Sequence, residues 1–362
     1  MIAPAPRRIG LSFGHLRTFN DGIGELSLQL GHGLAQRAAQ LRAEHGIDLH
    51  YHLPLGLHGH FGQQVQYLPS SDLQRLVHVG HGRFDVWHSL HQFNPFKAPL
   101  GARRIVQTIL DLNFMHVGNA RKQRKYLRRM RGLARRSAAL ITISHFVGGD
   151  LRQHLGTVTP VHVIALAARD LSGSRQQAVD TLPGPRFLLH VSRMAPTKNV
   201  MALLDLAEAW PEMGLVLAGA RSPYSLEVAG QVASRHLSNV RVLHDITDQQ
   251  KAWLLAHCEA FVFPSLTEGF GLPPLEAMHF GKPVFLSRLT SLPEVGGQAA
   301  SYFDSFEPGA MRRTIEEGIE RHRRHALADA VAAHARTFSW MRCTDQHVAL
   351  YLNLLGCATG HQ

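Results

Sequence analysis

Two carboxylates, Glu268 and Glu276, stand on either side of a glycine-rich segment that runs from Gly269 to Leu272. Glycine lets the backbone approach a ligand closely, and the free N–H groups at the start of a helix favour a phosphate. A carboxylate would repel that phosphate at contact distance, so Glu276 is expected to accept hydrogen bonds from a vicinal diol such as ribose. Glu268 is suited to hold sugar hydroxyls or to stabilise developing positive charge. The pattern predicts a nucleotide-sugar site, and the alternative is a helix-capping Glu276 with a solvated Glu268.

Two cations, Arg193 and Lys198, follow a second apolar run at 187–191. Ligands of open α/β sheets bind at the carboxyl ends of strands, where this segment is expected to lie. Arginine can grip a diphosphate through two hydrogen bonds while lysine acts as a mobile charge. The pair would therefore stabilise the negative charge on a departing nucleoside diphosphate. Two exposed loop cations are the alternative.

Two segments of the first half also follow predicted strands. Gly22 and Gly24, in the segment 20–25, open a helix and are suited to admit a donor phosphate or an acceptor. They lack the third glycine of a dinucleotide fingerprint, which disfavours an NAD enzyme. Asp111 is suited to orient an acceptor or a sugar hydroxyl, and a strand-end cap is the alternative.

Short apolar runs alternate with helical stretches along all 362 residues, which is typical of two doubly wound α/β domains. We predict a Rossmann-like domain at 1–168, a polar linker at 169–185, a second Rossmann-like domain at 186–337 and a C-terminal helix at 338–362. Strands are predicted at 9–13, 48–53, 85–88, 104–110, 139–143, 187–191, 214–218, 240–243, 260–263 and 283–286.

The segment Pro264 to Met278 resembles the Glu-x7-Glu signature of retaining GT-B glycosyltransferases of family 4, and the likeness continues through 281–284 and 291–295. The segment with Arg193 and Lys198 is similar to the Arg-x4-Lys element of that family. The resemblance implies an α/β GT-B fold in which two Rossmann-like domains face each other across a cleft. It also implies a C-terminal helix that crosses back onto the first domain.

The resemblance assigns roles to the residues of the pattern. It implies that Glu268 faces the transferred sugar, that Glu276 binds the ribose, and that Arg193 and Lys198 hold the diphosphate without a metal ion. Leu110 stands where relatives usually carry a histidine, so the role of that histidine does not carry over. The donor-binding backbone would comprise Gly269, Phe270, Gly271 and Leu272, with Gly22 and Gly24 across the cleft.

The expected function is retaining transfer of a hexose from a nucleotide-diphosphate sugar to a cell-envelope glycan or a lipid-linked acceptor. The acceptor would belong to lipopolysaccharide or exopolysaccharide synthesis, and GDP-mannose is the donor that we favour. Two alternatives stay open. One is a non-catalytic or diverged GT-B protein that binds anionic surfaces, which Leu110 favours, and the other is a GT-B nucleotide-sugar epimerase, which the Glu268/Glu276 pattern disfavours.

The formal net charge is +11, and residues 1–170 hold 21 Lys and Arg against 9 Asp and Glu, whereas residues 171–362 hold 17 against 18. The segment from Arg121 to Arg136 has helical composition and no acidic residue. We expect an amphipathic helix whose basic face contacts an anionic membrane surface, and an ordinary solvated face is the alternative. Nucleic acid is not expected, because no zinc-finger, RNP-like or basic-heptad motif accompanies the basic stripe.

Three cysteines without a paired framework suit a reducing compartment, and no apolar stretch approaches the roughly 18 residues that span a bilayer. The expected location is the cytoplasm, peripheral on the cytoplasmic membrane. The 25 histidines form i,i+3 pairs about as often as chance predicts, and neither a His-Glu-x-x-His frame nor an Asp-x-Asp motif occurs. No metal site and no cofactor other than the nucleotide-sugar substrate are expected.

Overall fold

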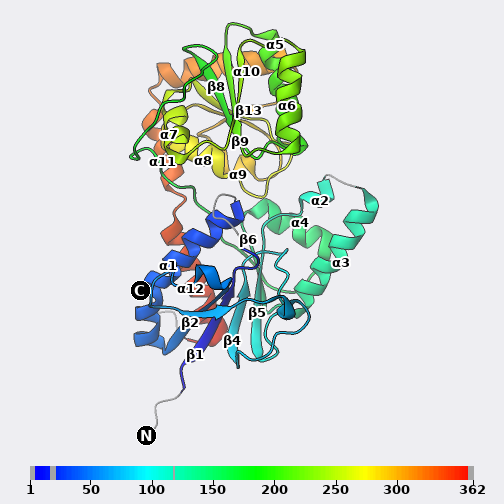
Figure 1. The fold of residues 1–362 in the computed structure, drawn as a ribbon, viewed down its shortest axis with the longest axis vertical. Coiled ribbons are helices and arrows are strands. Elements are labelled where there is room, and N and C mark those ends of the chain that lie inside the picture. The colour runs from blue at the N-terminus through cyan, green and yellow to red at the C-terminus, as the bar shows by residue number, and fades with distance from the viewer. Residues whose placement is uncertain (1–4, 17–21, 117–118, 358–362) are drawn as a thin grey trace. The chain divides into compact units, whose positions relative to one another are not determined.

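The computed structural model describes residues 5–16, 22–116 and 119–357. The chain divides into two compact units: unit 1 comprises Met1–Leu166 with Ser339–Gln362, and unit 2 comprises Ala167–Phe338 (Figure 1). Each unit is built on a parallel sheet with helices packed on it. The predicted doubly wound α/β architecture is therefore confirmed.

In unit 1 the described strands form one parallel sheet in the order β3-β2-β1-β4-β5-β6-β7. The central strands are apolar runs buried on both faces, as Ile9, Leu11 and Val86 illustrate. The strands are β1 (Arg7–Ser12), β2 (Ile47–Leu53), β3 (Gln66–Pro69), β4 (Phe84–Ser89), β5 (Ala102–Ile109), β6 (Ala139–Thr142) and β7 (Val161–Val163). The helices are α1 (Gly22–His45), η1 (Leu55–Leu57), η2 (Asp72–Arg75), α2 (Asn113–His116), α3 (Ala120–Arg136), α4 (His145–Leu155) and α12 (Trp340–Leu355).

The C-terminal helix α12 is a structural part of unit 1, where it packs against α1 and β4 (Figure 1). Its Tyr351 hydroxyl lies 2.6 Å from Nδ1 of His88, whose Nε2 lies 2.8 Å from Thr108 Oγ1. His347 Nδ1 donates to the Cys343 carbonyl at 2.8 Å, and its ring stacks on that of His88. These buried contacts fix α12 on the sheet because a neutral imidazole can satisfy both of its nitrogens here.

In unit 2 the described strands form a parallel sheet in the order β10-β9-β8-β11-β12-β13. Its core is a continuous apolar cluster that includes Leu188, Val262 and Phe285. The strands are β8 (Phe187–Val191), β9 (Gly214–Gly219), β10 (Val240–His244), β11 (Ala260–Phe263), β12 (Val284–Ser287) and β13 (Ser301–Phe303). The helices are η3 (Pro196–Lys198), α5 (Val200–Ala209), α6 (Pro223–Ser234), α7 (Asp248–His257), α8 (Leu272–His279), α9 (Leu292–Gly296), α10 (Pro308–Arg324) and α11 (Ala328–Arg336).

Each of the ten predicted strands is present within about two residues of its predicted bounds. Among the described residues, the prediction missed β3, β7 and β13, which are all edge strands. An edge strand is covered on fewer sides than a central one, so it needs no continuous apolar run. Short sequences such as Gln66–Pro69 and Val161–Val163, which are partly exposed, therefore carry too weak a signal.

The basic segment forms the predicted amphipathic helix, α3. The Asn119 side chain caps its start by accepting a hydrogen bond from the Lys122 N–H, and Met130 and Ala134 are buried against unit 1. The arginines of the opposite face are exposed. In the part of the chain that the structure describes, no helix has both the length and the apolar character needed to cross a bilayer.

Buried histidines make the stability of both units depend on pH. Burial lowers the pKa of His52, His190 and His347 to about 4, whereas the unfolded chain binds these protons near pH 6.5. The unfolded state therefore holds more protons between these values. The contribution of these histidines to the free energy of unfolding is fully present above about pH 6.5 and is lost as the pH falls toward 4. At about pH 5 the loss is roughly 2 kcal/mol per histidine.

We expect urea unfolding at about pH 5 to show a markedly lower midpoint than unfolding at about pH 7. Replacement of His347 by Gln should reduce the difference in unfolding free energy between the two pH values, because one titrating group is removed. Equal stability of the unmodified protein at both pH values would contradict this account.

Candidate active site

Two loops carry the principal charged residues of unit 2. One follows β8 and contains Arg193 and Lys198, and the other follows β11 and contains Glu268. Since β8 and β11 pair directly as parallel neighbours, their carboxyl ends lie side by side at one edge of the sheet. Lys198 Nζ lies 2.5 Å from Glu268 Oε1, with only 15% and 12% of the two side chains exposed. The structure thus brings together two of the predicted site residues from positions 70 apart.

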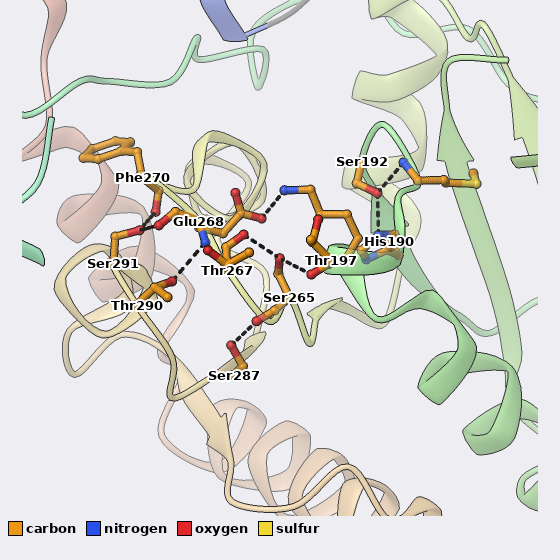
Figure 2. A network of polar contacts seen from close by, with 12 residues as sticks. His190, Ser192, Thr197, Ser265, Thr267, Glu268, Phe270, Ser287, Thr290 and Ser291 are labelled. Carbon is orange, nitrogen blue, oxygen red and sulfur yellow. Dashed lines mark hydrogen bonds and ion pairs between the residues drawn. The ribbon is translucent and has the colours of Figure 1, made fainter. Parts of the chain in front are cut away.

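A buried histidine shapes the first of these loops. His190 Nδ1 lies 2.9 Å from the carbonyl of Val262, so this nitrogen donates. The Nε2 atom of His190 accepts from Ser192 Oγ at 2.8 Å (Figure 2). Ser192 Oγ in turn accepts from the Met194 N–H at 3.0 Å. Burial lowers the pKa of His190 to about 4, with a further lowering from Lys198, which keeps the ring neutral. The network fixes the backbone on both sides of Arg193.

Hydrogen bonds from small side chains join the two loops to each other. Ser265 Oγ donates to the Thr197 carbonyl at 3.1 Å, and the Leu266 N–H donates to the same carbonyl at 2.7 Å. Ser287 Oγ, at the end of β12, donates to the Ser265 carbonyl at 2.5 Å (Figure 2). Because Thr197 directly precedes Lys198, these contacts set the distance between the Lys198 and Glu268 backbones.

Thr290 and Ser291, in the loop after β12, form hydrogen bonds with the backbone of Glu268 and Phe270. The Glu268 N–H donates to Thr290 Oγ1 at 3.0 Å, and Ser291 Oγ donates to the carbonyls of Phe270 and Glu268 at 2.7 and 3.1 Å (Figure 2). Gly271 has φ +128°, a value that side chains disfavour, and it caps α8 at Leu272. The segment Gly269 to Leu272 is thereby held in a fixed turn beside Glu268.

The second carboxylate, Glu276, lies one turn into α8 and pairs with a residue of α7. Lys251 Nζ is 2.9 Å from Glu276 Oε1, and only 14% and 13% of their side chains are exposed. Lys251 also lies 3.7 Å from Asp248, which Arg169 grips with two hydrogen bonds of 2.7 and 3.1 Å. Burial alone would raise the pKa of Asp248, but Arg169 and Lys251 hold it below its usual value.

Arg193 contributes an exposed charge to the same loop as Lys198. Within the described residues its guanidinium makes no hydrogen bond or ion pair. The loop pair therefore holds two cations against the single carboxylate of Glu268, and one guanidinium stays available to an anion. This arrangement suits a diphosphate, since a guanidinium and an ammonium can share its oxygens.

The comparison with protein families assigns this part of the chain. Residues 175–331 match the family described as glycosyl transferases group 1. The match spans most of unit 2, which therefore resembles a group 1 glycosyl transferase domain. The matched residues include both loops and both carboxylates of the site described above.

Two relatives of the chain are named as mannosyltransferases. O-antigen chain mannosyltransferase B of Escherichia coli is 35% identical over 173 residues, which are 46% of this chain and 45% of that protein. Serotype-specific mannosyltransferase WbdA of Escherichia coli is 35% identical over 202 residues, which are 52% of this chain and 24% of that protein. The match thus spans less than half the length of either relative.

Solved structures establish the fold of the whole chain. A sucrose-phosphate synthase from Thermosynechococcus elongatus superimposes with a TM-score of 0.72 at 17% identity, over 97% of this chain and 99% of that one. Anabaena HepE in complex with UDP and glucose gives a TM-score of 0.70 at 18% identity, over 96% and 99% of the two chains. The predicted GT-B class is therefore confirmed.

The remaining predicted site residues lie in unit 1. Gly22 is the first residue of α1, and a Cβ built there meets only open space; Gly24 is buried in the same helix, and residues 20 and 21 lie outside the described residues. Asp111 follows β5, and its carboxylate accepts from the Asn113 N–H at 3.1 Å, as expected of a strand-end cap. Gln92 accepts from the Leu110 N–H and donates to the Asp111 carbonyl. The roles of these residues stay predictions.

Sequence reasoning missed the residues that support the site. Lys251, Thr290 and Ser291 act across loops and helices, so no local pattern marks their partners. His190 did leave a signal, because a polar residue inside the apolar run of β8 must find hydrogen-bond partners when buried. In the described ranges, no group of three or more His, Cys, Asp and Glu side chains is arranged to hold a metal ion.

The Lys251–Glu276 pair yields a stability prediction for unit 2. Lys251→Met should lower the free energy of unfolding of unit 2 by about 2 kcal/mol or more, because it leaves a mostly buried carboxylate without its partner. The double variant with Glu276→Met should recover much of this loss. Urea unfolding measures both effects.

The matched control is Arg324→Met, which breaks an exposed ion pair with Glu320 in the same unit. Its cost should stay within about 1 kcal/mol. If the control variant lowered the free energy of unfolding as much as Lys251→Met does, the burial of the Lys251–Glu276 pair would not add to its stabilising effect.

Proposed function

We propose that the chain is a retaining, metal-independent glycosyltransferase. It would move a hexose from a nucleotide-diphosphate sugar to a cell-envelope glycan or lipid-linked acceptor of lipopolysaccharide or exopolysaccharide type. The observation that carries the proposal is the mostly buried Lys198–Glu268 pair, which a dedicated hydrogen-bond frame holds beside the exposed charge of Arg193 in a group 1 domain. The named mannosyltransferase relatives support mannose, and GDP-mannose is our proposed donor.

Donor binding would exchange one anionic partner of Lys198 for another. The diphosphate would bind to Lys198 and Arg193. The Glu268 carboxylate, released from its ion pair, would then accept hydrogen bonds from hydroxyls of the transferred sugar. The exchange limits the cost of separating a buried pair, since neither charge is left without a partner. Glu276, oriented by Lys251, accepts hydrogen bonds from the ribose. The backbone of Gly269 to Leu272 lies against the donor phosphate or sugar.

The proposed chemistry uses the leaving group as the base. As the bond between C1 and the phosphate oxygen breaks, the acceptor oxygen bonds to C1 from the same face and its proton passes to the leaving phosphate. Arg193 and Lys198 stabilise the charge that accumulates there. No pair of carboxylates of the glycosidase type is needed, which agrees with a site that holds Glu268 next to a lysine. Asp111 would orient the acceptor, with Gly22 and Gly24 near a phosphate or the acceptor.

The alternatives receive less support. A diverged, non-catalytic protein has no need of a mostly buried ion pair with a complete hydrogen-bond frame. Burial of two charges carries a desolvation cost, which function would no longer offset. The mannosyltransferase relatives do not favour an epimerase. Leu110 would then affect the rate or the choice of acceptor rather than the donor site.

We also propose that the protein lies peripherally on an anionic membrane surface through α3. Three exposed arginines of this helix, Arg124, Arg128 and Arg135, make no hydrogen bond or ion pair with the described residues. They line a surface hollow of about 470 Å³ together with Leu127, Arg131 and Gly132. Each such cation near anionic lipid contributes about 1 kcal/mol, which would hold the enzyme near a lipid-linked acceptor in the cytoplasm.

Replacement of Glu268 by Gln separates binding from turnover. We expect transfer of the sugar from the donor to the acceptor to fall at least about 100-fold, because the charge that positions the sugar is lost. Binding of the nucleoside diphosphate should be unchanged or tighter, since Lys198 loses a competing carboxylate. Transfer is measured by product formation and binding by calorimetry.

The control is Asp304→Asn, an exposed acid of the same unit whose partner is Arg288. It should leave both quantities unchanged. Parallel loss of binding and turnover in Glu268→Gln would contradict the division of roles, and full turnover in that variant would refute the proposed site.

A further inference from the structure

Two connecting segments of unit 1 carry exposed aliphatic side chains. One connects β3 to β4 and the other connects β4 to β5, and backbone hydrogen bonds join them from Lys97 to Gln74 at 3.0 Å and from Leu100 to His78 at 3.1 Å. They place four aliphatic side chains outward, which we call the apolar strip: Leu73, Leu76, Val79 and Leu100, with exposed fractions of 62%, 73%, 54% and 78%.

The coil beneath the apolar strip is firmly anchored, so the exposure does not reflect a loose loop. Gln74 is buried, with its Oε1 2.8 Å from His52 Nε2, and it accepts from the Ser71 N–H. His78 Nδ1 lies 2.8 Å from the Lys97 carbonyl. Single exposed leucines are common, but several on adjoining, fixed segments mark an interaction surface.

The connection between β4 and β5, which carries Leu100, also contacts the basic helix. Near its start the Phe93 ring meets the Tyr126 ring edge-on at 5.9 Å. Arg129 Nη2 donates to the Asn94 carbonyl at 3.2 Å, one residue further along. One connecting segment of unit 1 therefore contacts α3 near its start and carries Leu100 near its end.

Exposed cations flank the apolar strip. Arg75 and Lys97 belong to its two segments, and Arg83, Arg103 and Arg104 lie where β4 and β5 begin. Ion pairs link Arg75 with Asp72 and Arg103 with Asp85, which leaves an excess of positive charge. This excess would repel a second copy of the same surface and attract an anionic one.

We propose that the apolar strip inserts its leucine side chains into the interfacial region of an anionic lipid bilayer. The inference rests on the proposed membrane placement but adds a second contribution to the free energy of membrane binding. Attraction between arginines and anionic lipid is screened by salt, whereas burial of aliphatic side chains among acyl chains is not. The two terms can therefore be measured separately.

The test is sedimentation of the full chain with vesicles of phosphatidylcholine and about 30% phosphatidylglycerol, at low salt and at about 0.5 M salt. The unmodified protein should retain measurable binding at high salt. The combined variant Leu73→Ser, Leu76→Ser and Leu100→Ser should lose at least about tenfold of this salt-resistant binding, because each buried leucine side chain contributes to partitioning. The variant Arg128→Gln, Arg129→Gln and Arg131→Gln should lose mainly the low-salt binding.

The control is Met341→Ser, an apolar residue of α12 in unit 1 whose exposed fraction is 68%, which should bind as the unmodified protein does. As a second readout, an environment-sensitive fluorophore at Leu76→Cys, in a Cys357→Ser background, should report an apolar environment on vesicles, whereas one at Met341→Cys should not. Unchanged salt-resistant binding of the serine variant, or the absence of salt-resistant binding in the unmodified protein, would overturn the inference. Nucleotide binding without vesicles tests the transferase proposal independently.

Discussion

The ion pair between Lys198 and Glu268 is the constraint on which the candidate site of unit 2 depends. Both side chains are largely removed from water, so each would carry a desolvation cost without the other. The pair forms only because β8 and β11 are neighbours, and because Ser265 and Thr290 fix the loops that follow them. These polar contacts come from small side chains that fit between closely spaced backbones. The frame therefore holds two charges at contact distance without a rigid covalent link.

A second pair, Lys251 with Glu276, follows the same principle at the start of α8. In both pairs a lysine that is flexible in water is confined beside a carboxylate, which makes the charges available to a ligand at a defined place. A nucleotide sugar would offer matching partners for Lys198, Glu268 and Glu276, since it carries phosphate oxygens and hydroxyls a short distance apart. The ligand would thus replace existing interactions rather than create a site from disordered loops. This is the physical sense in which the domain is prepared for a donor.

The sequence predicted the central strands and the identity of the charged residues, but not the way in which they are paired. Apolar runs such as 260–263 are buried on both faces and carry a strong signal, whereas β13 at the sheet edge does not. Glu276 was singled out as a site residue without its partner, because Lys251 lies 25 residues earlier on another helix. Such partners depend on tertiary packing, which has no local period. The Asp111 carboxylate accepts a hydrogen bond from the Asn113 N–H, a local contact that any strand end could make.

The central claim is that the charges on the two loops of unit 2 form a binding site for the diphosphate of a nucleotide sugar. The most direct measurement is thermal unfolding with UDP, GDP, ADP and their sugar conjugates, at low salt and in the presence of EDTA. A ligand that binds only the folded state raises the melting temperature by mass action. The account predicts that one nucleotide and its conjugates raise the melting temperature clearly while the others do not. Absence of a shift with every nucleotide would contradict it.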